Sequence, residues 1–150
     1  MWKRLLQTSD DTTNLFLRLA LAVVFFPHGA QKVLGWFGGH GFTATLGFFT
    51  EKMSIPTVFA LLAIAAEFLG SIGLFVGLLT RVAAFGIFCV MAVAVTLVHA
   101  QVGFFMNWFG QIPAGKEGFE FHILALALAF AVMVRGAGPV SFDRALSKKR

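Results

Sequence analysis

Seven ionisable side chains lie within or at the ends of long apolar stretches of this sequence: Arg18, His28, Lys32, Glu67, His99, Glu120 and His122. On insertion scales, a charged side chain at the centre of a bilayer costs about 2.5–3.5 kcal/mol. Such residues therefore face other helices or the membrane interface, which makes them candidates for function. Burial also makes a carboxyl group easier to protonate near neutral pH. We assign the proton-handling, catalytic role to Glu67, His99 and Glu120.

A second group of polar residues lies in the stretch FFPHGAQKVLGWF, residues 25–37. At 100° per residue, Arg18, His28 and Lys32 fall within about 80° of one another on a helix, so they share one face. Pro27 has no N–H to donate to the carbonyl four residues earlier, which predicts a kink there. We therefore expect His28 and Lys32 to bind a ligand beside the kink.

The depth of these residues predicts a pocket. His28, Lys32, His99 and Glu120 fall in the outer half of their stretches. Glu67 lies near the middle, on a helical stripe of small residues that let helices approach closely (Ala63, Gly70, Gly77, with Gly73 adjoining). We expect a pocket entered from the outer side, with Glu67 at its floor and aromatic residues such as Phe25 and Phe104 along its walls.

A structural network is an equally weighted alternative for the same residues. Lys32 paired with Glu120, and Arg18 paired with Glu67, would hold four helices in register. Matched depth and opposite charge favour the Lys32–Glu120 pair in particular. On the fourth stretch, Glu120 shares a face with Ala127 and Ala131. His122 is about 200° away, so its direction stays open.

The composition indicates a membrane protein. Hydrophobic residues make up 58% of the 150 residues and charged residues 13%, with a mean hydropathy of +0.83. Soluble chains carry about 25% charged residues. Four apolar stretches, at about 15–34, 57–79, 82–105 and 118–137, approach or exceed the length that crosses about 30 Å of hydrocarbon. Backbone groups must be satisfied within lipid, so we predict an all-α, membrane-embedded antiparallel four-helix bundle forming one domain, 1–150.

Basic residues predict the orientation. Eight lie at the termini and at the turn between the second and third stretches (Lys3, Arg4, Arg81, Arg135, Arg144, Lys148, Lys149, Arg150), against three on the other side (Lys32, Lys52, Lys116). The positive-inside rule then places both termini in the cytoplasm of a bacterial inner membrane, with an uncleaved first span. The net charge of +5 favours anionic lipid head groups over nucleic acid as the partner.

The segments outside the spans carry their own signals. Trp36 and Trp108 fall where an interfacial aromatic belt belongs. Residues 42, 46, 49 and 53 are apolar at helical spacing, which predicts a short amphipathic helix on the outer leaflet. After the fourth span, Ser141 is placed to cap a last short helix.

Metal binding is not favoured by these residues. The single cysteine, Cys89, excludes an intrachain disulfide and a multi-cysteine metal site. Bundles that hold metals use a Glu-x-x-His pair, whereas Glu120 and His122 are two residues apart and face different ways. We therefore predict no metal site.

The sequence resembles the DoxX family of small bacterial four-helix membrane proteins, from about Leu17 to Asp143. The resemblance rests on HGAQKVLG, EFLGSIGLFVGLLTR, a VH pair late in the third span, GFEFHILAL and GPVSFD, in this order. Carried over by position, it implies roles for Gly29, Lys32, Glu67, Arg81, His99, Glu120, Ser141 and Asp143. It also implies association with membrane oxidoreductase complexes, some of which use quinone as acceptor, or with redox homeostasis.

Two functions follow as hypotheses. One is a quinone-interacting membrane subunit of a redox complex, with Arg18, Arg81 and Asp143 as a structural polar network around the pocket. The chain has no haem, flavin or iron–sulfur motif, so a partner oxidoreductase would carry the electrons. The other is a non-catalytic anchor or assembly factor that uses the outer loops for docking. A transporter would require oligomerisation, and a homo-oligomer stays open.

Overall fold

The computed structural model describes residues 5–111, 113 and 115–148, and helices form all of the regular structure in this part of the chain. Lys3, Arg4, Lys149 and Arg150, which the orientation prediction uses, lie outside the described residues. The long helices are α2 (Thr12–Leu34), α4 (Thr57–Val76), α5 (Thr80–Leu97) and α6 (Glu120–Arg135). The short ones are η1 (Trp36–Gly38), α3 (Gly41–Gly47), η2 (Phe48–Lys52), η3 (His99–Gln101) and α7 (Phe142–Lys148).

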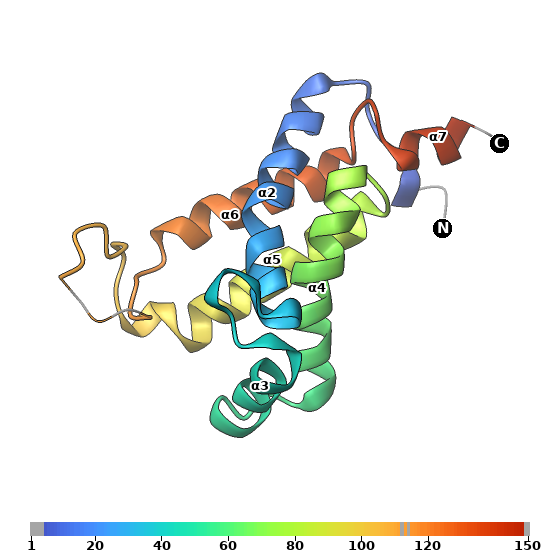
Figure 1. Cartoon of the computed structure of the whole chain (residues 1–150). Helices are drawn as coiled ribbons and strands as arrows, with labels where there is room; N and C mark the ends of the chain where they lie inside the picture. The colour runs from blue at the N-terminus through green and yellow to red at the C-terminus, as the bar shows by residue number, and fades with distance from the viewer. Residues whose placement is uncertain (1–4, 112, 114, 149–150) are drawn as a thin grey trace.

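The four long helices pack around one core. Helix α2 packs against α4 and α6, and α5 packs against the same two helices. In the view of Figure 1, α5 and α6 run obliquely to α2 and α4. Buried side chains from all four helices meet in the core, among them Leu21, Phe25, Leu74, Ile87 and Val132.

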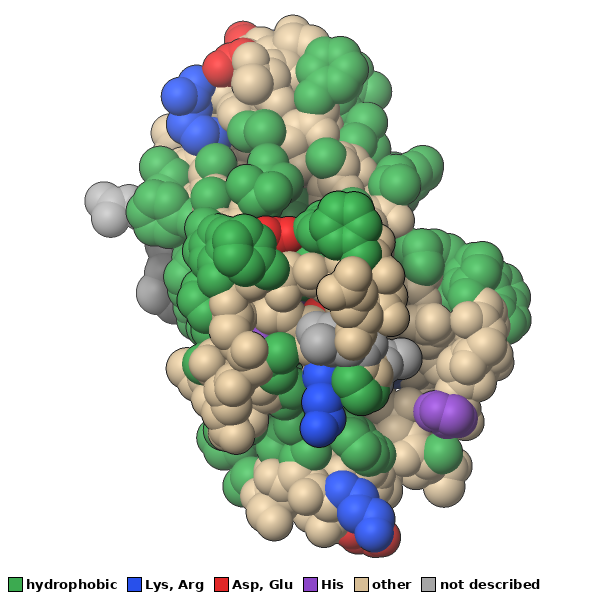
Figure 2. Space-filling view, turned by 90° about the vertical axis from the view of Figure 1, so that its left-hand side faces the viewer, with side chains coloured by type: hydrophobic (Ala, Val, Ile, Leu, Met, Phe, Trp, Pro, Cys, Tyr) green, Lys and Arg blue, Asp and Glu red, His purple; other side chains and the backbone are tan. Residues whose placement is uncertain are grey.

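Three of these helices are long and apolar enough to cross a membrane: α2, α4, and α5 together with η3. Helix α6 has 16 residues, about 24 Å at 1.5 Å per residue, which is shorter than the hydrocarbon core of about 30 Å. A membrane bundle of four spans therefore stays a prediction. Figure 2 shows hydrophobic side chains spread over one face of the molecule, with some Lys or Arg, Asp or Glu, and His side chains among them.

The third predicted stretch, 82–105, ends as a helix earlier than expected, at Leu97. The backbone of residues 103–105 instead accepts hydrogen bonds from the backbone of residues 118–120, at 2.9–3.1 Å. A carbonyl that bonds the opposite segment is no longer part of a helix. This pairing also sets the start of α6 at Glu120, two residues after the predicted start.

A single glycine brings α2 and α4 together. A Cβ atom at Gly29 would lie 2.6 Å from the Cα of Phe68 and 2.8 Å from the carbonyl carbon of Glu67. Any side chain at position 29 would therefore push the two helix backbones apart. The rings of Phe26 and Phe68 stack beside this contact, 6.2 Å apart.

Arg18 joins three segments at the end of the molecule opposite Gly29. Its guanidinium is 2% exposed and donates hydrogen bonds of 2.6–2.9 Å to the carbonyls of Leu74, Phe75, Ala137 and Val140. The predicted Arg18–Glu67 pair is therefore wrong, because all three guanidinium nitrogens of Arg18 donate to backbone carbonyls at the end of α4 and in the segment before α7. A structural role for Arg18 stays a prediction.

Asp143 and Arg81 complete this polar network. The Asp143 carboxylate is buried and accepts the backbone N–H groups of Leu79 and Thr80 at 2.7 and 2.9 Å. It thereby satisfies the free donors at the start of α5. Arg81 donates to the carbonyls of Gln7 and Met133, at 3.1 and 2.5 Å. The start of α5 and the end of α6 are thus tied to both terminal segments.

Two local predictions are confirmed. A short helical segment follows the first span, as α3 and η2, although its contact with a membrane surface stays a prediction. Ser141 precedes α7, and its Oγ accepts the backbone N–H of Arg144 at 3.2 Å, as an N-cap does.

Candidate functional site

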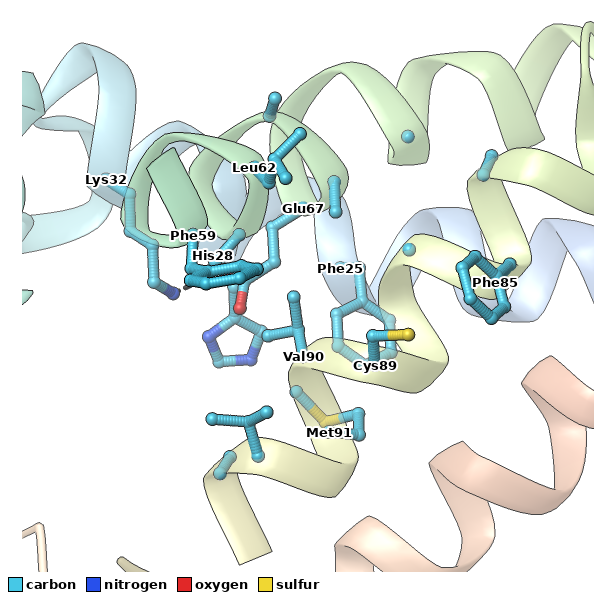
Figure 3. A pocket seen from close by; sticks show the side chains of 18 of the residues that line it. Phe25, His28, Lys32, Phe59, Leu62, Glu67, Phe85, Cys89, Val90 and Met91 are labelled. Carbon is cyan, nitrogen blue, oxygen red and sulfur yellow. Dashed lines mark hydrogen bonds and ion pairs between the residues drawn. The ribbon is translucent and has the colours of Figure 1, made fainter. Parts of the chain in front are cut away.

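A cavity of about 1400 Å³ lies among α2, α4 and α5, and its walls are mainly apolar. Figure 3 shows Phe25, Phe59, Leu62, Phe85, Val90 and Met91 around it. Small-molecule pockets measure about 300–1000 Å³, so this cavity has room for a ring with an attached hydrophobic tail. Ala63, Gly70 and Gly73 line it too. The small residues near Glu67 therefore leave space in the wall as well as permitting close helix contact.

An ion pair between Lys32 of α2 and Glu67 of α4 lies on the cavity wall. The Glu67 side chain is 5% exposed and that of Lys32 23%. The predicted partner of Lys32, Glu120, is wrong. Lys32 follows Gly29 by three residues on the same helix, and Gly29 packs against the backbone at Glu67 and Phe68. The close approach of α2 to α4 therefore puts the Lys32 ammonium next to the carboxylate of α4.

His28 lies beside this ion pair, as Figure 3 shows. Its ring lines the cavity, lies within electrostatic range of both Lys32 and Glu67, and is 6.3 Å from the ring of Phe25. We call His28, Lys32 and Glu67 the α2–α4 polar cluster. It places an ammonium, a carboxylate and an imidazole side by side on an otherwise apolar wall, so hydrogen-bond donors and acceptors are both available to a bound molecule.

A second group of polar residues lies where α5 and α6 meet the segment that joins them, residues 102–119. We call this segment the outer loop, after the side of the membrane on which it is predicted to lie. The rings of His99 and His122 lie 4.1 Å apart, centre to centre, and both line the cavity. His99 Nδ1 donates to the carbonyl of Glu117 at 2.6 Å. His122 is 6% exposed, and its Nδ1 has no hydrogen-bond partner among the described residues. We call His99 and His122 the histidine pair.

The direction of His122, which the sequence left open, is toward the core. The buried face of α6 consists of His122, Ala125, Ala129 and Val132, and the spacing of these four residues is a helical stripe. The small apolar residues at that spacing were the signal in the sequence that could have predicted a core-facing direction for His122. The prediction followed the face of Glu120 instead, with Ala127 and Ala131, and Ala127 is exposed.

Two predicted site residues lie outside the cavity. The Glu120 carboxylate accepts a hydrogen bond from Trp108 Nε1 in the outer loop. The predicted pocket role of Phe104 is not supported either, because this side chain is 47% exposed and packs against Phe105 and Phe119. Neither residue contributes to the lining. The backbone pairing of 103–105 with 118–120 turns both of them toward the outer loop.

The cavity is longer and more open than expected. Its lining runs from Met53, between η2 and α4, to Leu79 at the turn before α5. Glu67 therefore lies part-way along the cavity and not at a floor. Phe59, Leu69 and Phe85 also line it, although 63%, 63% and 55% of their surfaces are exposed. The cavity therefore opens along the flank formed by α4 and α5.

Within residues 5–111, 113 and 115–148, no group of three or more histidine, cysteine, aspartate or glutamate side chains is placed to hold a metal ion. Cys89 lines the cavity as a free cysteine.

Comparison with protein families shows that the DoxX family model matches residues 13–100. The chain belongs to the DoxX family. The match spans α2, α4 and α5, and so includes the α2–α4 polar cluster and His99. It ends before α6, so the resemblance seen in residues 118–143 rests on the quoted motifs alone. Searches against curated proteins and against solved structures found no significant match.

Proposed function

We propose that this DoxX protein is an integral protein of the bacterial inner membrane that binds a quinone in the cavity and serves a partner oxidoreductase as a membrane subunit. The observation that carries the proposal is the partly buried Lys32–Glu67 ion pair on the wall of an apolar cavity that opens along the exposed flank of α4 and α5. A largely apolar pocket with a few convergent polar groups is typical of small-molecule sites.

Stability alone is a weak reason to keep this ion pair. Hydrogen bonds between membrane helices contribute about 0.6 kcal/mol on average, whereas burying charge is costly. Gly29 already holds α2 and α4 together through direct backbone contact. A role in binding explains why the polar atoms face open space rather than the packed side of the helices.

The α2–α4 polar cluster offers the groups that a quinone ring needs. The Lys32 ammonium and the His28 imidazole are donors suited to a quinone carbonyl, and Glu67 can exchange a proton as the ring changes its redox state. The exposed flank between α4 and α5 suits the hydrophobic tail. Electrons would come from the partner subunit.

We also propose that the protein is a four-span bundle with cytoplasmic termini. The segment before α2 contacts the end of α6 and helix α7: Asp11 pairs with Arg135 and Asp10 with Arg144, both at 2.7 Å. The start of α2 and the end of α6 therefore lie at the same end of the molecule, which requires an even number of crossings. Local thinning of the bilayer accommodates a short span such as α6. A periplasm-active reporter fused after Arg150 should be silent, and activity there would overturn this topology.

Quinone binding is tested with purified protein in nanodiscs and a short-tailed quinone such as decylubiquinone. Glu67→Gln retains the volume of the side chain but removes its charge, so we expect it to fold and to lose quinone affinity at least tenfold. Glu51→Gln is the matched control, because Glu51 is exposed on η2. A Glu67→Gln protein with reduced thermal stability and full quinone affinity would contradict the binding role.

A non-catalytic anchor or assembly factor is the second candidate, and the outer loop favours it. Phe105, Trp108 and Phe109 are 76%, 74% and 89% exposed. Such aromatic side chains suit docking to a partner or to the outer leaflet. If this reading is correct, replacing Phe109 with serine should abolish co-purification of the partner oxidoreductase, whereas Glu67→Gln should leave it intact.

A further inference from the structure

The histidine pair belongs to the same cavity as the α2–α4 polar cluster but comes from different elements. His99 lies in η3, just after α5, and His122 lies in the first turn of α6. Glu117 and Met106 of the outer loop line the cavity beside them. The pair therefore marks the part of the cavity wall next to the outer loop, a position that the proposed function does not use.

The hydrogen bond to Glu117 decides which nitrogen of His99 carries a proton. A carbonyl oxygen can only accept, so Nδ1 is the donor in the 2.6 Å bond. In the neutral ring, Nε2 then carries the lone pair and is an acceptor. His99 is thus fixed as a hydrogen-bond acceptor toward any molecule that reaches Nε2.

His122 supplies the second indication of a ligand. Its ring is 94% buried, since only 6% of its surface is exposed, and Nδ1 lacks a partner among the residues that the structure describes. A buried polar atom left without a hydrogen bond destabilises the protein. His122 lines the cavity, so a bound hydroxyl group that reaches Nδ1 would supply the missing hydrogen bond.

We propose that the histidine pair binds the hydroxyl group of a quinol, with His99 Nε2 accepting its hydrogen and His122 hydrogen-bonded to the same oxygen. This inference rests on the proposed function, because it concerns the same cavity. It adds a second polar contact and a preference for the reduced ligand. The oxidised quinone has only acceptors on its ring oxygens, so it offers no hydrogen to His99.

The test compares three probes of similar shape in nanodiscs: decylubiquinol, decylubiquinone, and the dimethyl ether of the quinol, which has no hydroxyl hydrogen. The wild-type protein should bind the quinol roughly tenfold more tightly than the ether, the size of one lost hydrogen bond. His122→Phe and His99→Phe should abolish this preference. His40→Phe, at an exposed histidine between η1 and α3, is the matched control and should keep it.

A second measurement needs no variant and decides the question if His122→Phe fails to fold. With ¹⁵N-labelled histidine, the quinol should shift the ring-nitrogen resonances of His99 and His122, and the ether should shift them less. The inference is overturned if quinol binds while these resonances stay in place, or if His122→Phe keeps the preference for quinol. In this experiment, the proposed function itself fails if the wild-type protein binds none of the three probes.

Discussion

Replacing Arg18 with methionine tests how α2 is held to the end of α4 and to the segment before α7. The guanidinium is buried and donates to four backbone carbonyls from two segments that are far apart in the sequence. Methionine retains most of the volume but none of the donors. Each buried carbonyl left without its donor costs about 1–3 kcal/mol, so the loss of several is expected to total about 3–5 kcal/mol. We therefore expect Arg18→Met to lower the free energy of unfolding by that amount.

Thermal unfolding of purified protein in one detergent measures this effect. At about 2–4 °C per kcal/mol for a chain of this size, the midpoint should fall by about 6–20 °C. Arg135→Met is the matched control, because the Arg135–Asp11 pair is a surface ion pair with side chains 53% and 39% exposed. Such pairs contribute about 0–1 kcal/mol. Equal midpoints for Arg18→Met and Arg135→Met would refute the reasoning.

Two further predictions concern helix packing and pH. Gly29→Ala places a Cβ 2.6 Å from the Cα of Phe68, so the α4 backbone must retreat by about 0.8 Å to reach ordinary contact at 3.4 Å. We expect thermal unfolding to show a net loss of about 1–2 kcal/mol, after the better helix propensity of alanine is included. Gly47→Ala, which meets no atom closer than 3.9 Å, should show no such loss. The hydrogen bond from Thr13 N–H to Asp11 lowers the pKa of the Asp11 carboxyl. Stability from this charge is therefore present above the unfolded pKa of about 3.9 and lost as the pH falls through the lower folded value. Thermal unfolding should show Asp11→Asn below the wild type at pH 6 and converging with it at pH 3, and a difference that persists at pH 3 would contradict this.

Local periodicity predicted some site residues well and others poorly. Glu67 was predicted to face protein, and it is buried. The prediction succeeded because a single carboxylate on an apolar helix avoids lipid only when its face packs against other helices. Glu120 and His122 are two residues apart in the first turn of α6, so periodicity alone did not decide between their faces. The backbone pairing of 103–105 with 118–120 decides it, and that pairing joins segments 15 residues apart.

The sequence by itself determined that this protein is helical and inserts into a membrane, because apolar stretches of this length leave no other way to satisfy their backbone. It also determined the DoxX family, through motifs that can be read without coordinates. Only the tertiary structure decided the partners of the charged residues. Lys32 meets Glu67 rather than Glu120 because Gly29 brings α2 onto α4. Electrostatic attraction is similar for either carboxylate, so the close approach of two backbones makes the choice.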